Sequence, residues 1–377
     1  MKRVLDLIIK CLLIMGASSC NIDEVTITSL PAEIIVDGSG NYRTRVGDTI
    51  TISPQYKNCE EATFCWTIDQ EIVCRESDYT HLAESVGKVT IKLVVTNESG
   101  STEQLFTIDI IDHFKVYDYT PAPGQFINEL KTSGFDGTQT TLESAIACAE
   151  KRLLEDKFVS LGAFGGYIVV GFDQSVSNID SYDFAIGNNA FDSSSEPGVV
   201  WVMQDENGDG EPNDTWYELS GSESGKEETQ QNYEITYYRP EASEMDVTWS
   251  DNMGNSGAVK YLKDFHDQDS YYPAWIEADS YTLRGTLLKS RSFDSSGNGS
   301  KWVNPAFDWG YADNASTIDN QQRENLFEIS NAIDDKGNAV TLDYIDFIKV
   351  QSAIQQQCGW IGEVSTEVTS FRVIQNE

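Results

Sequence analysis

The 377-residue sequence is poor in basic residues and in histidine. Lys and Arg total 26 against 61 Asp and Glu, for a formal net charge of −35 at pH 7, and only three His are present. A field of this sign repels nucleic acid and anionic membrane surfaces, so neither is an expected partner. Hydrophobic residues make up 40% of the chain, which is too many for a disordered protein.

The motifs of common catalytic machinery are also missing. The sequence contains no GxSxG, HExxH, Walker or protein-kinase signature, and the glycine pair at 165–166 lacks the Lys-Ser/Thr of a phosphate loop. No Cys/His spacing indicates zinc. Paired carboxylates are inevitable among 61 acids, so a glycosidase pair cannot be recognised by sequence. We therefore predict a non-catalytic protein, with a glycan hydrolase as one alternative.

A membrane-spanning apolar run is absent too. Val4–Met15 is interrupted by Asp6 and Lys10 and is too short to cross a bilayer. Basic residues precede it, and the small residues at 16–19 lead directly into Cys20, a pattern that resembles a bacterial lipobox. We expect a signal peptide over 1–19, a lipid on Cys20 and a tether over 20–24, with an ordinary signal peptide as the alternative. The membrane contact would then be the lipid anchor alone, on the outer surface of the outer membrane.

Seven cysteines are present, of which Cys11 falls in the predicted signal peptide. Without Cys11 and Cys20 an odd number remains, so at least one thiol stays unpaired within the chain. Cys65 and Cys74 flank a short hairpin-like segment. The pairing stays open among five residues: Cys59, Cys65, Cys74, Cys148 and Cys358.

Helical pattern is scarce. Only residues 140–154 carry an apolar stripe at helical spacing, preceded by a capping box of Thr140 and Glu143. The crossover helices of a parallel α/β protein are missing, so the fold class expected is all-β with one helix.

The first predicted domain spans 25–112. Its apolar runs are short and separated by turns, and residues 88–95 alternate as a half-buried antiparallel strand does. The segment GKVTIKLVVTNESG at 87–100 resembles the late strands of PKD domains, an immunoglobulin-like family, with Trp66 where that family places its core aromatic residue. The family's WDFGDG signature is absent. We predict a PKD-like sandwich that acts as a spacer or contact module.

The second predicted domain spans 113–377. Strand-like runs broken by Asn, Asp, Gly and Ser predict a larger, jelly-roll-like sandwich. The main runs lie at 164–172, 181–191, 199–203, 216–219, 233–240, 246–252, 281–289 and 345–353.

An acidic loop joins the runs 199–203 and 216–219. Asp205, Asn207 and Asp209 alternate and are followed by Gly210, the arrangement of the first half of a calcium loop. The carbonyl of Glu211 and the side chains of Asn213 and Asp214 complete the predicted Ca²⁺ ligands. The closing Glu of an EF-hand is missing, since Trp216 stands there, and no helices flank the loop. A metal-free acidic turn is the alternative.

Aromatic residues in loop-like segments are the candidates for ligand binding. Flat rings beside carboxylates and amides suit the recognition of sugars or corrinoids, although many such rings belong to a core. The candidates are Tyr271, Tyr272, Trp275, Trp302, Trp309, Tyr311 and Trp360.

The C-terminal half is similar to a family of Bacteroidota cell-surface proteins in which a PKD-like domain precedes a calcium-loop jelly roll. The segments that carry the resemblance include SLGAFGGYIVVGFD, SSEPGVVWVMQDENGDGEPNDTWYELSGSE, FDWGYADN and CGWIGEVSTEV. The resemblance implies a surface lipoprotein that binds a glycan or a corrinoid such as cobalamin for a TonB-dependent transporter or beside other surface lipoproteins. A calcium-stabilised structural or adhesive module is the other alternative.

Overall fold

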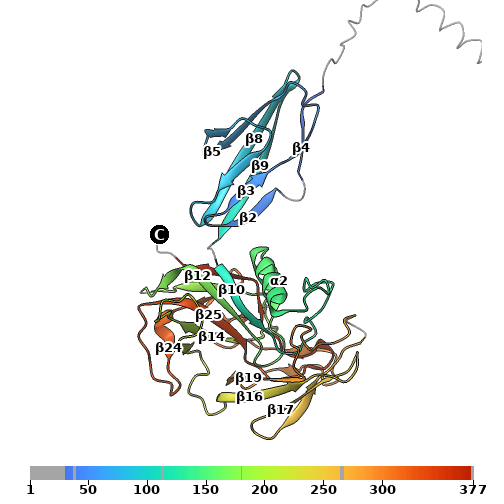
Figure 1. Cartoon of the computed structure of the whole chain (residues 1–377), viewed down its shortest axis with the longest axis vertical. Coiled ribbons are helices and arrows are strands. Elements are labelled where there is room, and N and C mark those ends of the chain that lie inside the picture. The colour runs from blue at the N-terminus through green and yellow to red at the C-terminus, as the bar shows by residue number, and fades with distance from the viewer. Residues whose placement is uncertain (1–29, 37–39, 112–113, 180, 264–266, 375–377) are drawn as a thin grey trace, which may run out of the picture. The chain divides into compact units, whose positions relative to one another are not determined.

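The structure is a computed structural model, and it describes residues 30–36, 40–111, 114–179, 181–263 and 267–374 (Figure 1). The predicted signal peptide, Cys20 and the tether lie outside these ranges. The chain divides into two compact units, the first made of residues 1–41, 51–80 and 90–107, and the second of 42–50, 81–89 and 108–377. The boundary expected at residue 112 stays a prediction.

The N-terminal strands form one five-stranded antiparallel sheet and two strand pairs. The sheet order is β2-β9-β8-β5-β6, and the pairs are β1-β4 and β3-β7. The strands are β1 Glu33–Ile35, β2 Asn41–Arg45, β3 Thr49–Ile52, β4 Gln55–Lys57, β5 Thr63–Ile68, β6 Glu71–Cys74, β7 Tyr79–Leu82, β8 Gly87–Asn97 and β9 Gly100–Ile111.

Trp66, on β5, lies in the apolar core of these N-terminal strands. Its side chain is fully buried and packs on Tyr79 and Phe106 at ring distances of 5.6 and 5.4 Å. Its indole N–H donates to the carbonyl of Glu76 at 2.9 Å, so burial leaves no polar atom of this side chain unpaired. The predicted alternation of β8 is also present, because Ile91, Leu93 and Val95 are all buried.

The five described thiols outside the N-terminal segment are free. Cys74 pairs with Trp66 across β5 and β6, whereas Cys65 is the neighbour of Trp66 along β5. Consecutive strand residues point to opposite faces of a sheet, so Cys65 and Cys74 lie on opposite faces. The hairpin bridge between them is therefore ruled out by the register.

The C-terminal part is also built from antiparallel strands. Its largest sheets have the orders β10-β12-β25-β14-β15-β24, β22-β23-β13-β27 and β18-β17-β16-β19, with strand pairs β11-β26 and β20-β21. The elements are β10 Phe114–Thr120, α2 Leu142–Leu154, β11 Val159–Ser160, β12 Tyr167–Ser177, β13 Phe184–Gly187, β14 Gly198–Met203, β15 Trp216–Leu219, β16 Gln230–Tyr238, β17 Val247–Asp251, β18 Ser256–Val259, β19 Ser280–Leu287, β20 Phe293–Asp294, β21 Trp302–Val303, β22 Asn320–Gln321, β23 Glu324–Phe327, η1 Ile329–Asn331, β24 Ala332–Ile333, β25 Tyr344–Ser352, η2 Gly359–Ile361, β26 Glu367–Val368 and β27 Ser370–Val373.

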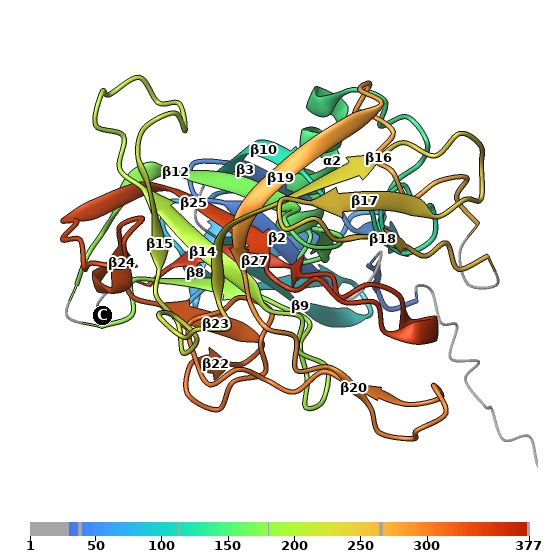
Figure 2. The same ribbon diagram turned by 90° about the horizontal axis from the view of Figure 1, so that it is seen from below.

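Two of these sheets enclose the main core. The inward residues of β12, β14 and β25 share one buried cluster with those of β13, β23 and β27. In Figure 1 β12, β25 and β14 lie side by side, and α2 lies beside β10. The sheet that contains β16, β17 and β19 has its own cluster of buried tyrosines, and Figure 2 shows its strands as a separate layer. The all-β class is confirmed, with α2 as the α-helix of the described residues.

The cap of the helix lies one residue later than predicted. Thr141, not Thr140, is the N-cap: its side chain accepts the N–H of Ser144, and its own N–H donates to the Ser144 hydroxyl rather than to Glu143. The N–H of Thr140 is bonded to the carbonyl of Thr138, so residue 140 belongs to the preceding turn. The buried face carries Ala145, Ala149 and Leu153, as its spacing predicts.

Candidate functional site

Four of the seven candidate aromatic residues belong to the core. Tyr271, Tyr272, Trp275 and Tyr311 are 0%, 1%, 6% and 1% exposed. The Tyr311 hydroxyl accepts the N–H of Glu223 at 3.0 Å, so its polar end is paired inside the protein. A ligand ring has no access to these four, and the structure places them as packing residues instead.

The other three candidates lie at different places. Trp360 is 49% exposed, at η2. Trp302 is partly buried and packs against the cluster around Phe307, in contact with Gly359. Trp309 is partly buried and lines a pocket of about 390 Å³. Among the seven candidate aromatic residues, Trp309 is therefore the one that lines this cavity.

We call this cavity the Trp309 pocket. It is built entirely from the C-terminal sandwich, between the end of β15, the loop before β22, and β23 with η1. Its lining consists of Tyr182, Leu219, Ser220, Trp309, Gly310, Ile318, Asp319, Leu326, Phe327, Glu328 and Asn331.

A close crossing of two backbone segments positions Trp309. Gly310 has a φ of +88°, and a Cβ added there would lie 2.5 Å from the Cα of Gly221. The N–H of Gly310 donates to Asp319 Oδ2 at 2.6 Å, and the carbonyl of Trp309 accepts the N–H of Ser222 at 3.0 Å. Backbone bonds on both sides therefore fix the Trp309 main chain, and only glycine fits the crossing.

The Trp309 pocket is acidic. Asp319 is 3% exposed, and its Oδ1 has no hydrogen-bond partner among the described residues. Burial raises the pKa of Asp319, although the Gly310 N–H and the Ser316 side chain act against it. Burial raises the pKa of Tyr182, and the charges of Asp319 and Glu328 raise it further. Both carboxylates are therefore close enough to Tyr182 to interact with it electrostatically. No Lys, Arg or His stands among the described residues that line the pocket. Its chemistry is that of hydrogen-bond acceptors beside aromatic and apolar walls.

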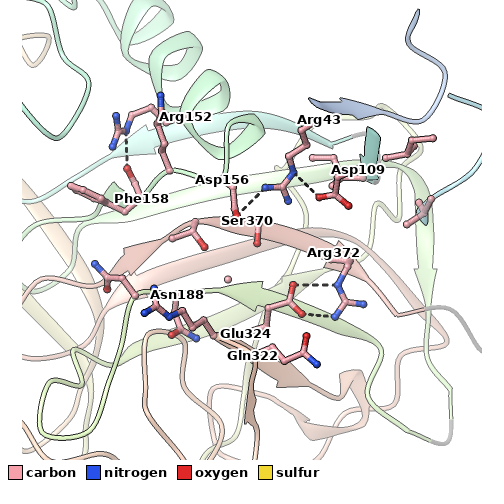
Figure 3. A pocket seen from close by; sticks show the side chains of 18 of the residues that line it. Arg43, Asp109, Arg152, Asp156, Phe158, Asn188, Gln322, Glu324, Ser370 and Arg372 are labelled. Carbon is pink, nitrogen blue, oxygen red and sulfur yellow. Dashed lines mark hydrogen bonds and ion pairs between the residues drawn. The ribbon is translucent and has the colours of Figure 1, made fainter. Parts of the chain in front are cut away.

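A second cavity, of about 1050 Å³, is richer in basic side chains (Figure 3). Most of its arginines are committed to partners. Arg43 pairs with Asp156 at 3.0 Å, Arg152 donates to the carbonyl of Phe158 at 2.7 Å, and Arg372 pairs with Glu324 at 2.5 Å. Figure 3 draws these bonds, of which the two with Asp156 and Glu324 are ion pairs that offset the charge of Arg43 and Arg372, whereas the bond to the Phe158 carbonyl orients Arg152 without offsetting its charge.

The predicted calcium loop connects β14 and β15, whose bounds agree with the predicted strands. Asp205 lies at its centre, because its carboxylate accepts the N–H groups of Gly208 at 2.8 Å and Gly210 at 2.8 Å. Asp205 itself is anchored through its N–H to Asp346 Oδ2 at 2.7 Å.

The remaining side chains of this loop face one another across it. Asn213 bonds to Asn207 at 3.1 Å and to Asp209 at 3.0 Å. Asp214 instead accepts the N–H groups of Glu206 and Asn207, so it closes the loop. The side-chain oxygens of Asp205, Asn207, Asp209 and Asn213 are of the kind that Ca²⁺ takes, and each residue also accepts a hydrogen bond within the loop, so the Ca²⁺ site here stays a prediction.

A second loop repeats this arrangement and was missed in the sequence. Asp294, Ser296 and Asn298 alternate before Gly299, whose N–H donates to Asp294 Oδ2 at 2.6 Å, as Gly210 does to Asp205. The same alternate spacing was the signal that pointed to 205–210, and it was available here. With one carboxylate among three side chains, this loop carries less charge.

Three carboxylates from distant segments meet inside the sandwich. Oxygens of Glu196, Asp313 and Glu367 all lie within 4.8 Å of one another. Asp313 and Glu367 are 1% and 3% exposed, and Glu196 is partly buried. Burial raises the pKa of each of the three, and the charge of Glu367 adds to the rise for the other two. We call these residues the acidic triad. It is a set of oxygen ligands that could hold a metal ion.

Comparison with protein families identifies the N-terminal part. A PKD-like domain profile matches residues 31–97, which confirms the class expected there. A search of curated proteins found no match. Among the described residues, no helix has the length and apolar character needed to span a membrane.

Solved structures are similar only at low scores. A putative α-galactosidase from Bacteroides fragilis is 11% identical over 28% of this chain, with a TM-score of 0.19, and the chain spans 22% of its length. A SusE-like protein is 8% identical, with 91% and 97% of the two chains covered and a TM-score of 0.19. The protein SGBP-B of the Bacteroides ovatus mixed-linkage glucan utilization locus, in complex with a heptasaccharide, is 9% identical, with 85% and 99% covered and a TM-score of 0.18.

Proposed function

We propose that this protein is a non-catalytic surface lipoprotein that binds a neutral glycan in the Trp309 pocket and presents it to a TonB-dependent transporter. The pocket is the observation that supports the binding function. It combines an aromatic ring, apolar walls and carboxylate acceptors, which is what a sugar needs for stacking and for orienting its hydroxyl groups.

The size and charge of the pocket select among the ligands expected from the sequence. Its volume of about 390 Å³ lies near the small end of the ~300–1,000 Å³ range of small-molecule sites. That size favours one or two sugar units over a corrinoid macrocycle. Asp319 and Glu328, with no basic residue beside them in the described lining, repel anionic sugars such as uronates.

The lipid anchor on Cys20 and the transporter partner belong to the same proposal and rest on the sequence. The loop 205–214 is proposed as a Ca²⁺ site that rigidifies the β14–β15 hairpin. Because β15 ends at Leu219, which lines the Trp309 pocket, an ordered hairpin also supports the pocket wall.

Isothermal titration calorimetry tests which ligand binds, with the soluble chain, meaning the chain without the signal peptide and Cys20. The panel contains neutral oligosaccharides, uronate oligosaccharides and cyanocobalamin. We expect a neutral sugar to bind and Trp309→Ala to weaken its binding by about tenfold, since aromatic stacking contributes ~0.5–1.5 kcal/mol beyond the buried area. Trp360→Ala is the matched control, because Trp360 is exposed outside this pocket.

Three outcomes would contradict this function. Binding of cobalamin and of no sugar would show that the ligand is a corrinoid. Loss of sugar binding in Trp360→Ala but not in Trp309→Ala would show that the sugar binds at Trp360 and not in the Trp309 pocket. Absence of any binding, together with Ca²⁺-dependent melting, would leave the structural or adhesive module.

A hydrolase is the second candidate, because two carboxylates line the same pocket. Burial raises the pKa of Asp319, as a general acid requires, and Glu328 stands in the same lining. Release of reducing ends from a bound oligosaccharide, abolished by Asp319→Asn, would establish the hydrolase. Binding without turnover establishes the non-catalytic protein.

A further inference from the structure

The three carboxylates of the acidic triad are brought together by segments far apart in the sequence. Glu196 lies two residues before β14, Asp313 lies in the loop after Trp309, and Glu367 opens β26. No loop motif gathers them, so only the folded chain forms this cluster. It is also separate from the predicted calcium loop, which contributes none of its members.

The backbone around the triad is rigidly connected. The N–H of Glu196 donates to the carbonyl of Asp313 at 2.9 Å, and the N–H of Glu367 donates to Asp313 Oδ2 at 2.8 Å. The hydroxyl of Thr366 donates to the carbonyl of Glu196 at 2.8 Å. Each of the three segments is therefore bonded to another, and the carboxylates are held in place before any ion binds.

One oxygen of the triad is left without a partner. Asp313 is 1% exposed, its Oδ2 accepts the N–H of Glu367, and its Oδ1 makes no hydrogen bond of ordinary geometry among the described residues. The N–H groups of Asn189 and Ala190 lie near enough to act against the rise in the pKa of Asp313, but neither is in bonding geometry with Oδ1. A buried carboxylate oxygen without a donor is costly, because it has lost its water and gained nothing in return. A cation bound between the three carboxylates would give Asp313 Oδ1 the favourable partner that it lacks.

We propose that Glu196, Asp313 and Glu367 form a buried binding site for one divalent cation, with Ca²⁺ as its preferred occupant. Three carboxylates this close together, two of them buried and one partly buried, cannot all remain ionised without a compensating charge. All the ligand atoms are oxygens, which selects a hard cation over zinc or copper. Ca²⁺ accepts bidentate carboxylates in flexible geometry, whereas Mg²⁺ gives up its waters reluctantly and suits a buried site less well.

The Ser365 side chain supports the same assignment. Its hydroxyl donates to Glu367 Oε1 at 2.8 Å, which orients that carboxylate within the triad. Orientation of a ligating carboxylate by a neighbouring hydrogen bond is typical of metal sites. An ion here would join the segment before β14, the loop that follows Trp309 and the strand β26 at one point.

The experiment uses the soluble chain in which Asp205→Ala, Asp209→Ala and Asp294→Ala remove the carboxylates of both acidic loops, so that the triad is the candidate site under test. Chelator-treated protein is titrated with CaCl₂ and with MgCl₂, and bound metal is counted by plasma mass spectrometry after gel filtration. We expect one equivalent of Ca²⁺, tighter binding than for Mg²⁺, and a rise in Tm of roughly 5 °C at a hundredfold excess over Kd.

Substitution in the same background then locates the ion. Glu367→Gln and, separately, Asp313→Asn should remove the bound equivalent and the Ca²⁺-dependent rise in Tm. Glu218→Gln is the matched control, because Glu218 is a buried carboxylate outside the triad, and it should keep both.

The competing explanation is that protons alone neutralise the triad. In that case the loop-deficient chain binds no Ca²⁺, and Glu367→Gln raises Tm equally in chelator and in calcium because it removes a like charge. Either result overturns the metal site. If the triad variants fail to fold, the titration of the loop-deficient chain decides by itself, since it needs no substitution in the triad.

Discussion

Glu218 should make stability depend on pH in a direction opposite to that of most surface carboxylates. It lies on β15 and is 5% exposed, and its Oε2 accepts the hydroxyl of Thr286 at 2.5 Å. Burial raises the pKa of Glu218 to about 7, against the hydrogen bond from Thr286 and the charge of Lys349. In the unfolded chain the ordinary value of 4.5 returns.

The sign of the effect follows from which state holds the proton. Between pH 4.5 and 7 the folded state keeps the Glu218 proton and the unfolded state loses it, so this contribution to stability is complete below pH 4.5 and is lost as pH rises through 7. A difference of 2.5 pKa units corresponds to about 3 kcal/mol at 1.36 kcal/mol per unit.

Glu218→Gln removes this titration while keeping the shape of the side chain. We expect the variant to match the wild type near pH 4.5 and to be more stable than it by about 3 kcal/mol at pH 8. Urea unfolding of both proteins at half-unit steps from pH 4.5 to 8 measures the difference. A constant difference over that range, or one that shrinks as pH rises, would refute a buried neutral Glu218.

Two further predictions concern stability. Glu129→Gln should have the opposite pH dependence. Although burial opposes it, the N–H groups of Thr132 and Ser133 lower the pKa of Glu129 to about 2. The wild type should therefore be more stable than the variant at pH 7, by less than ~3 kcal/mol because solvent screens part of the interaction, and the difference should be lost as pH falls from 4.5 through 2, as urea titration of both proteins checks. Gly310→Ala should cost at least ~1–3 kcal/mol through its positive φ and its contact with Gly221, and should weaken sugar binding. Gly208→Ala is the control for strain alone, because nothing lies within 4 Å of its added Cβ; equal losses in the two variants would mean that the crossing is not tight.

The sequence predicted the features that depend on local periodicity. The two strands around the acidic loop and the helix at 142–154 lie where alternation and helical spacing place them, because neighbouring residues alone decide those patterns. The cap of the helix was misplaced by one residue, since Thr140 and Thr141 are both suitable caps and the turn at Thr138 decides between them.

Aromatic residues show the limit of such reasoning. Tyr271 and Trp309 both follow turn-forming residues, yet one is at the centre of a core and the other lines a pocket. Composition cannot separate them, because burial depends on which sheet covers the ring. The pocket partner Asp319 carried no signal at all, since it stands ten residues from Trp309 in an ordinary turn sequence.

By itself, the sequence determined the all-β class, the helix and the oxygen-rich loop between β14 and β15, because each is set by residues within a few positions of one another. Tertiary structure alone decided the Trp309 pocket and the acidic triad. Glu196, Asp313 and Glu367 are separated by more than fifty residues at each step, and their carboxylates meet only when the sandwich closes and removes them from water.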